Sequence, residues 1–283
     1  MVNKEVRKIK IGNIKMTKLI AEIGWNHMGD MKLAKEMISA ARESGADFAK
    51  FQTWSVDRLK SGVWDTDGRR EIYEKAELNL DKHFELKDYC DKVGIGFMSS
   101  VFSEKDAKLL SKVVTDYVKI PSFESNNGKL INYCSRNFDE LIISTGTRTL
   151  KEIKYITRYL HHMKTEFTLL HCVSSYPCSF EIVNLPRLYD LREIHKIGFS
   201  DHTEGIEASV IALSQFNLKY IEKHFTIDND LPGRDNKFAI LPDKLKRLKE
   251  YIDIHSKVTL DHGSDYQECE LDSRENYTGR FDG

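Results

Sequence analysis

Short apolar runs alternate along the chain with longer segments in which apolar residues recur every three or four positions. The short runs predict buried strands, and the longer segments predict amphipathic helices that pack one face against a sheet. The eight predicted strands lie at residues 18–24, 47–53, 96–100, 116–122, 140–146, 167–172, 196–202 and 219–225. The predicted helices include residues 31–46, 103–112, 149–163, 205–217 and 242–255. This alternation over about 250 residues predicts an α/β fold, the (β/α)8 or TIM barrel.

Three segments lie outside this repeat. Residues 1–17 alternate apolar and polar positions around Gly12 and Asn13, which predicts an N-terminal β-hairpin that caps one mouth of the barrel. Residues 54–80 are long for a connection between strand and helix, and they fall where such barrels carry active-site loops, so they are a candidate lid. Residues 259–283 are polar and glycine-rich and predict a short C-terminal extension. The catalytic barrel is then expected to span residues 18–258.

The composition narrows the classes of function. The chain has 283 residues and a formal net charge of −1, so no overall field attracts nucleic acid or an anionic membrane surface. It has neither an apolar run of about 20 residues nor a signal-peptide pattern, which predicts a soluble cytoplasmic protein. The five cysteines are scattered without a C-x-x-C pair, which predicts free thiols and neither a disulfide framework nor a structural zinc site.

Polar side chains gather at the carboxyl ends of the predicted strands, where enzymes of this fold keep their catalytic residues. Lys50 and Lys119 lie near the ends of the second and fourth strands, and Ser100, Ser122 and Ser144 occupy comparable positions. A lysine that points into a barrel is costly unless an anion or a carboxylate neutralises it. The set therefore predicts a phosphate or carboxylate pocket. The alternative is that each lysine faces outward or forms a buried ring of ion pairs with Glu22, Glu124 or Glu222.

Two histidines, His202 and His224, end consecutive predicted strands at equivalent positions of the repeat. Two imidazoles that point into one small volume, with carboxylates and water nearby, suit a divalent transition metal. A strand-end histidine is otherwise a hydrogen-bonded core residue, and both interpretations stay open at this point. Asp201 is a candidate to orient one of these histidines by a hydrogen bond to the ring nitrogen that does not bind the metal. His27, in the loop after the first strand, is more typical of a loop contact.

Several stretches together resemble the sialic acid synthase family, whose members condense phosphoenolpyruvate with a sugar to make nonulosonic acids such as N-acetylneuraminate. The matching stretches are LIAEIGWNHMGD, GADFAKFQTW, GFMSSVF, VKIPSFESNN, IISTGTRTLKEI, LLHCVSSYP, GFSDHTEGIEAS and IEKHFTIDNDLPGRD. They occur in family order and cover the whole predicted barrel. The resemblance therefore implies the same fold and a phosphoenolpyruvate-dependent transferase that forms a carbon–carbon bond.

The resemblance also implies roles for individual residues. His202 and His224 would hold a divalent cation, Mn2+ before Mg2+ or Co2+. Lys50 and Lys119 would bind the phosphate and carboxylate of phosphoenolpyruvate, together with the hydroxyls of Ser100, Ser122, Ser144, Ser174 and Ser200. The positions that match residues facing the sugar are Gln52, Glu124, Tyr176 and Asp235. Of the two catalytic acids, Glu22 and Glu124, we assign Glu124 to the sugar. Glu22 matches an acid close to the reacting carbons, where it handles protons or orients hydroxyls.

The implied reaction is the metal-dependent condensation of phosphoenolpyruvate with an open-chain N-acylated hexosamine, such as N-acetylmannosamine, to a 2-keto-3-deoxy sugar acid and phosphate. Two alternatives stay open, namely a condensing barrel that uses another aldose or aldose phosphate, and an inactive binding scaffold. The family implies a homodimer in which an antifreeze-protein-like domain of the partner supplies an arginine to the sugar. We expect no such domain in this chain. A separate polypeptide would then supply that contact, or one of Arg234, Arg274 and Arg280.

Overall fold

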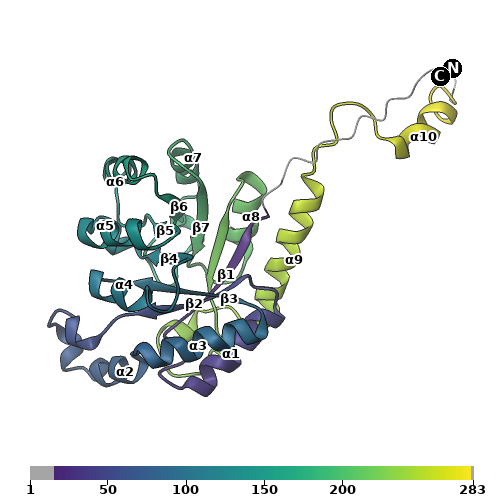
Figure 1. Ribbon diagram of the computed structural model, residues 1–283. Coiled ribbons are helices and arrows are strands. Elements are labelled where there is room, and N and C mark those ends of the chain that lie inside the picture. Colours follow the sequence, from purple (N-terminus) through teal and green to yellow (C-terminus); the bar gives the residue numbers. More distant parts are fainter. Residues whose placement is uncertain (1–15, 282–283) are drawn as a thin grey trace.

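The computed structural model describes residues 16–281 and, within them, closes eight parallel strands into one barrel in the order β1 to β8 (Figure 1). The strands are β1 Lys18–Gly24, β2 Phe48–Thr53, β3 Gly96–Val101, β4 Tyr117–Ile120, β5 Glu140–Ser144, β6 Glu166–His171, β7 Ile197–Asp201 and β8 Tyr220–His224. The predicted (β/α)8 barrel is confirmed, and each strand ends close to its predicted limit. The β-hairpin predicted around Gly12 and Asn13 lies outside the described residues.

Side chains alternate along each strand between the inside of the barrel and the surrounding helices, because successive Cβ atoms point to opposite faces of a sheet. A compact apolar layer fills the inside of the barrel and consists of Ile20, Phe48, Met98, Ile142, Leu170 and Tyr220. The residue two positions after each member of this layer points to the same side, and all six of these residues line a cavity. They are Glu22, Lys50, Ser100, Ser144, Cys172 and Glu222. The apolar layer is therefore the floor of a polar site at the carboxyl ends of the strands.

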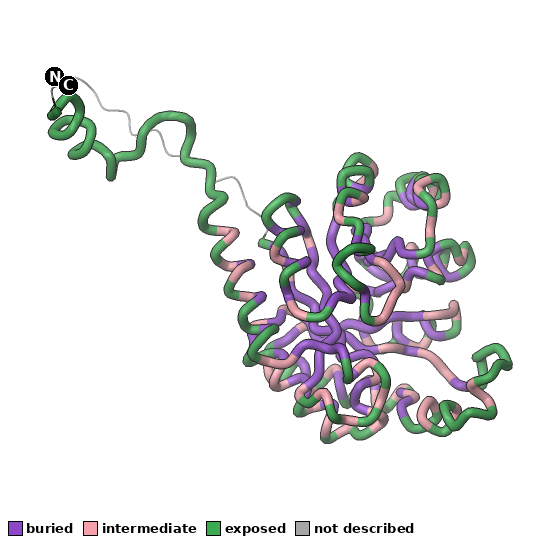
Figure 2. The backbone as a smooth tube through the Cα atoms, turned by 180° about the vertical axis from the view of Figure 1, so that it is seen from behind, coloured by how far each residue is buried: buried purple, intermediate pink, exposed green. Residues whose placement is uncertain are grey.

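Helices surround the barrel, whose strands are almost entirely buried, while the outward-facing residues of the helices are exposed (Figures 1 and 2). The helices are α1 Met31–Glu43, α2 Arg69–Ala76, α3 Leu80–Val93, α4 Glu104–Leu110, α5 Gly128–Asn137, α6 Leu150–His162, α7 Arg187–Arg192, α8 Glu207–Gln215, α9 Pro242–Val258 and α10 Leu271–Asn276. Short 3-10 turns lie at Val56–Arg58, Val63–Asp65, Ser122–Glu124, Phe180–Ile182, Asp235–Lys237 and Glu268–Glu270. The five helices named from the sequence correspond to α1, α4, α6, α8 and α9.

The candidate lid, residues 54–80, contains two 3-10 turns and α2. The backbone of the loop after β1 lies in close contact with the backbone of this segment. A Cβ built on Gly29 would lie only 1.7 Å from the carbonyl oxygen of Lys75. Gly29 also has a φ of +81°, in the left-handed region that favours glycine. This close approach holds α2 beside the first strand-end loop of the barrel.

The C-terminal part of the chain leaves the barrel. The end of α9 and the residues after it extend away from the other helices, and residues 259–281 are exposed throughout (Figures 1 and 2). Within residues 16–281, none of the helices combines the length and the apolar character that a membrane span requires.

Candidate active site

A cavity of about 270 Å³ lies at the carboxyl ends of the strands. Most of the predicted site residues line it, namely Glu22, Lys50, Gln52, Ser100, Lys119, Ser122, Ser144, Tyr176, Ser200, His202, His224 and Asp235. Glu124 and Ser174 are the predicted site residues that do not line it. The closed barrel thus brings together side chains as far apart in the sequence as Glu22 and Asp235, because every strand ends at the same mouth.

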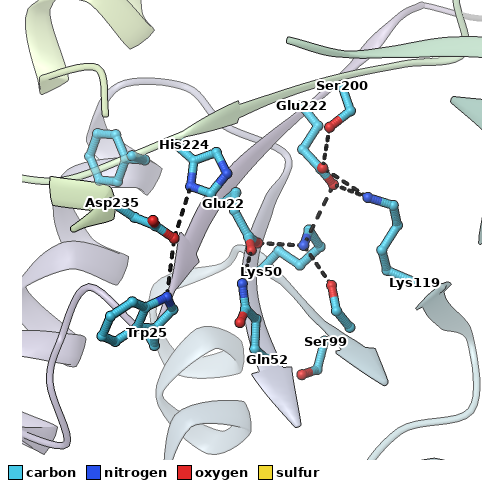
Figure 3. Close-up of polar contacts among 12 residues, drawn as sticks. Glu22, Trp25, Lys50, Gln52, Ser99, Lys119, Ser200, Glu222, His224 and Asp235 are labelled. Carbon is cyan, nitrogen blue, oxygen red and sulfur yellow. Dashed lines mark hydrogen bonds and ion pairs between the residues drawn. The ribbon is translucent and has the colours of Figure 1, made fainter. Parts of the chain in front are cut away.

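Lys50 and Lys119 take part in a buried network with two carboxylates (Figure 3). Lys119 Nζ donates to both oxygens of Glu222, at 2.8 and 3.0 Å, and Ser200 Oγ donates to one of them at 2.7 Å. Lys50 Nζ forms an ion pair with Glu22 and lies 3.6 Å from Glu222. Of the alternatives left open by the sequence, the structure therefore shows the ring of ion pairs, and this ring lines the cavity.

The two carboxylates of this network differ in their preferred charge. At Glu222, burial opposes ionisation, but Lys119 and Lys50 outweigh it and hold the pKa well below its usual range. At Glu22, burial dominates over the attraction of Lys50 and raises the pKa, although Gln52 Nε2 also donates to this carboxyl at 2.9 Å. The two ammonium groups therefore hold Glu222 ionised, and Glu22 is the more readily protonated of the two carboxyls. Glu22 is the group best suited to carry a proton.

The two predicted metal ligands lie close together, with the ring centroids of His202 and His224 5.5 Å apart. His202 Nδ1 lies 2.7 Å from the carbonyl oxygen of Val173, which orients the ring and leaves Nε2 as the acceptor nitrogen. His224 Nδ1 is buried without a hydrogen-bond partner, and a carboxylate oxygen of Asp235 is 4.0 Å away (Figure 3). Burial lowers the pKa of His202 to about 4 and that of His224 well below its usual value, so both imidazoles are neutral near pH 7.

These two imidazoles have the chemistry of metal ligands, since a neutral imidazole with a fixed tautomer is the form that coordinates a cation. No group of three or more His, Cys, Asp and Glu side chains in residues 16–281 has the geometry of a metal site. The pair therefore supplies two nitrogen donors, and the other positions around a bound cation would fall to water or to substrate. The buried, unpaired Nδ1 of His224 fits this arrangement.

A small polar recess surrounds Gly146, in the turn that follows β5. A Cβ at this position would lie 2.7 Å from Ser174 Oγ, 2.8 Å from Ser122 Oγ and 2.9 Å from Cys172 Sγ. The amide of Gly146 donates to Ser122 Oγ at 3.1 Å, and Ser174 Oγ is buried without a hydrogen-bond partner. Ser174 therefore belongs to the edge of the site although it does not line the main cavity.

Glu124 and Asp201 are engaged away from the cavity. Glu124 ends a 3-10 turn, and its carboxylate accepts a hydrogen bond from Asn127 Nδ2 at 2.8 Å, at the start of α5. Asp201 accepts a hydrogen bond from Ser209 at 2.6 Å and lies 3.3 Å from Lys223 Nζ. It forms no hydrogen bond with either histidine in the described part of the chain, because it points to the helix side of β7.

Several cavity-lining residues were not among those predicted. These residues are Trp25, Tyr73, Phe102, Pro121, Phe123 and Cys172, whereas Glu222 was expected only as a possible ion-pair partner of a lysine and Arg234 only as a possible sugar contact. The sequence could have placed Glu222 in the site, since it lies two positions before His224 on the same strand and so faces the same side. The aromatic residues come from loops and from α2, where no periodic pattern marks them. Of the three candidate arginines, Arg234 lines the cavity, whereas Arg274 and Arg280 lie in the exposed C-terminal part.

The fold and the cavity are those of a (β/α)8-barrel enzyme with a buried, charged site at the carboxyl ends of its strands. The NeuB family model matches residues 37–263. The chain is 35% identical to the N,N'-diacetyllegionaminic acid synthase of Legionella pneumophila, over 88% of this chain and 75% of that protein. It is 30% identical to the human N-acetylneuraminate-9-phosphate synthase, over 81% of this chain and 67% of that protein. The crystal structure of an N-acetylneuraminic acid synthetase from Leptospira borgpetersenii superposes with a TM-score of 0.84 at 29% identity, covering 97% of this chain and 95% of that one.

The chain therefore belongs to the NeuB family. The predicted enzyme class, a synthase of the sialic acid type that condenses phosphoenolpyruvate with a sugar, is confirmed at the level of this family.

Proposed function

We propose that the protein condenses phosphoenolpyruvate with an open-chain N-acylated hexosamine, of the N-acetylmannosamine type, and releases a nonulosonic acid and phosphate. The observation that carries this proposal is the buried network of Lys50, Lys119 and Glu222 at the carboxyl end of a NeuB-family barrel. Relatives named as legionaminic acid, pseudaminic acid and N-acetylneuraminate-9-phosphate synthases support the class of product.

In this proposal, the lysines and hydroxyls hold phosphoenolpyruvate. Lys50 Nζ, which also donates to Ser100 Oγ at 2.8 Å, and Lys119 Nζ would face its phosphate and carboxylate. Ser122, Ser144 and Ser200 line the same cavity and would add neutral donors. Groups that are fixed on strands stabilise the developing charge without having to reorganise during the reaction.

We propose that His202 and His224 hold a divalent cation, with Mn2+ as the first candidate and Mg2+ or Co2+ as alternatives. When bound there, such a cation supplies Lewis-acid polarisation of the sugar aldehyde. Tyr176, whose ring centroid lies 4.3 Å from that of His202, would position the sugar together with Gln52 and Asp235.

Glu22 is the proposed proton carrier. The methylene carbon of phosphoenolpyruvate bonds to the aldehyde carbon, the aldehyde oxygen takes up a proton, water adds at C2, and the bond between C2 and the phosphate oxygen breaks. Because burial raises its pKa, Glu22 is suited to hold and move a proton at its carboxyl oxygen during these steps.

The proposed reaction is tested by phosphate release from phosphoenolpyruvate in the presence of Mn2+ and a panel of sugars. We expect release with an N-acylated hexosamine and a product of the combined carbon skeleton by mass spectrometry. Release with a tetrose or pentose phosphate and none with hexosamines would instead favour the alternative aldose-phosphate synthase. Absence of release with every sugar, together with no binding of phosphoenolpyruvate by calorimetry, would favour an inactive scaffold.

A Gly146→Ala variant is expected to raise the KM for phosphoenolpyruvate at least about tenfold, because the added methyl group fills the recess between three polar side chains. The φ of Gly146 lies outside the left-handed region, so the backbone itself tolerates alanine. Steady-state phosphate release gives this KM. The matched control is Gly128→Ala, since a Cβ at Gly128 meets nothing within 4 Å. Equal KM values in the two variants would contradict a role for the recess.

We further propose a homodimer in the cytoplasm, in which Arg234 contacts the sugar. Analytical ultracentrifugation of the full chain tests the oligomeric state. An Arg234→Ala variant that keeps its KM for the sugar would contradict the part assigned to that residue.

A further inference from the structure

A second cavity of about 330 Å³ opens beside the active site. Its walls are mainly aromatic and include Trp25, Trp54, Trp64, Tyr73, Phe102 and Phe123, and we call it the aromatic cleft. Trp25 belongs to the loop after β1, and the next three residues belong to the long segment between β2 and α3. Of the residues that line this cleft, only Gln52 has a role proposed above.

Tyr73 of α2 lies at the centre of the aromatic cleft. The centroid of its ring is 5.6 Å from that of Trp25, 5.9 Å from that of Trp54 and 5.9 Å from that of Trp64. The three tryptophans thus surround one tyrosine in edge-on or tilted arrangements, which are the favourable ones for aromatic pairs. The walls of the cleft are consequently pre-arranged, and apolar surface remains accessible between them.

The aromatic cleft is continuous with the active site. Trp25, Gln52, Tyr73, Phe102 and Phe123 line both cavities. Gln52 donates to Glu22, and Trp25 Nε1 donates to Asp235 at 3.1 Å (Figure 3). An elongated substrate whose reacting end lies against Glu22 therefore has space for its other end in the cleft.

The walls of the aromatic cleft carry no charged side chain among the described residues. Two guanidinium groups lie near these walls, and both are already paired. Arg70, 5.7 Å from the centre of the Trp64 ring, pairs with Asp65 at 3.0 Å and Glu74 at 2.8 Å, and Arg69, beside Tyr73, pairs with Asp67 at 2.6 Å. A phosphate group placed here would lose its water without gaining a free cation, which is strongly unfavourable. Methyl groups, in contrast, gain contact with aromatic surface.

We propose that the aromatic cleft binds the end of the sugar acceptor that is remote from the aldehyde, and that it selects acceptors with apolar substituents there. The substrate class is an unphosphorylated hexose that carries acylamino methyl groups or a deoxy methyl group. This inference rests on the proposed function and narrows its acceptor. It makes a 6-phosphorylated hexosamine a poor substrate.

Intrinsic fluorescence gives a direct test, because all three tryptophans of the chain line the aromatic cleft. With phosphoenolpyruvate present and metal removed by a chelator, we would titrate three sugars: 2,4-diacetamido-2,4,6-trideoxymannose, N-acetylmannosamine and N-acetylmannosamine 6-phosphate. We expect the first to change the emission at the lowest concentration and the phosphorylated sugar to have the least effect. Tightest binding of the phosphorylated sugar would overturn the proposal.

A kinetic test uses Trp64→Ala, with Tyr155→Ala as the control because Tyr155 is an aromatic residue of α6 that is 76% exposed and does not line the cleft. We expect Trp64→Ala to raise the KM for the diacetamido sugar about tenfold or more, which is the usual effect of lost contacts in an apolar pocket. The KM for phosphoenolpyruvate should stay unchanged. If Trp64→Ala behaves like Tyr155→Ala, the proposal is wrong.

The inference and the proposed function fail in different ways. Phosphate release without discrimination among the three sugars would overturn the role of the aromatic cleft and leave the condensation intact. A sugar-dependent change in emission without phosphate release would overturn the condensation and support the cleft as a sugar site. The wild-type titration needs no variant, so a poorly folded Trp64→Ala protein would not prevent a decision.

Discussion

A Lys119→Met variant is expected to lose about 10²- to 10³-fold in kcat/KM for phosphoenolpyruvate, the usual effect of removing one fixed donor from a buried site. Lys119 is buried, and its ammonium group donates to both oxygens of Glu222 in the wall of the cavity. Methionine keeps the length of the side chain but removes the charge and the donors. Steady-state phosphate release, with kcat and KM determined separately, measures the effect.

The same substitution also destabilises the fold, because it removes one partner of a buried ion pair, which typically costs about 3–5 kcal/mol. A double variant, Lys119→Met with Glu222→Gln, removes the unpaired charge as well. We expect its thermal unfolding temperature to rise toward that of the wild type while its phosphate release stays low. Recovery of activity in the double variant would contradict an anion-binding role and leave Lys119 a purely structural one.

The matched control is Lys219→Met at the other end of the barrel. Lys219 directly precedes β8, and its ammonium group pairs with Glu140 at 2.6 Å. This variant also loses an ion pair with a strand-end carboxylate, but it lies at the amino ends of the strands. We therefore expect a loss of stability with unchanged KM for phosphoenolpyruvate.

The fold was predictable because the barrel repeats one local pattern eight times. Short apolar runs and amphipathic segments mark the residues that become buried, and the burial of these residues stabilises the closed barrel. The helix α3 was not named from the sequence although both of its end signals are present. The side chain of Asn79 accepts the amide hydrogen of Lys82, and Gly94 ends the helix with a φ of 75°. The two faces of α3 differ little in polarity, so its core-facing residues do not stand out as a helical period in the sequence.

The candidate site was predictable as far as strand ends determine it. One cavity is lined by Lys50, Lys119, His202 and His224. Alternation along the strands points these side chains inward, and all the strands end at the same mouth of the barrel. Contacts within the site depend on distances between strands, so the sequence left open whether the lysines pair with carboxylates. The same reason explains Glu124, whose 3-10 turn aims the carboxylate at Asn127. The aromatic walls come from loops, whose course no residue period describes.

Removal of divalent metal is expected to abolish phosphate release, and added Mn2+ is expected to restore it in the wild type but not in a His202→Ala variant. The carbonyl of Val173 fixes the ring of His202, and the neighbouring His224 carries a buried nitrogen without a partner. Loss of one imidazole leaves one nitrogen donor, which holds a cation poorly. Phosphate release after chelation and readdition of metal measures the effect.

Thermal unfolding separates metal binding from catalysis in the same variants. A cation present at about a hundred times its Kd stabilises the folded state by about 2.7 kcal/mol, so Mn2+ should raise the unfolding temperature of the wild type and leave that of His202→Ala unchanged. His162→Ala, at the exposed end of α6, is the control and should respond like the wild type. Full activity of the chelated wild type would contradict the metal dependence. If Mn2+ raised the unfolding temperature of His202→Ala as much as that of the wild type, only the assignment of His202 as a metal ligand would be contradicted. The cation would then bind elsewhere in the cavity.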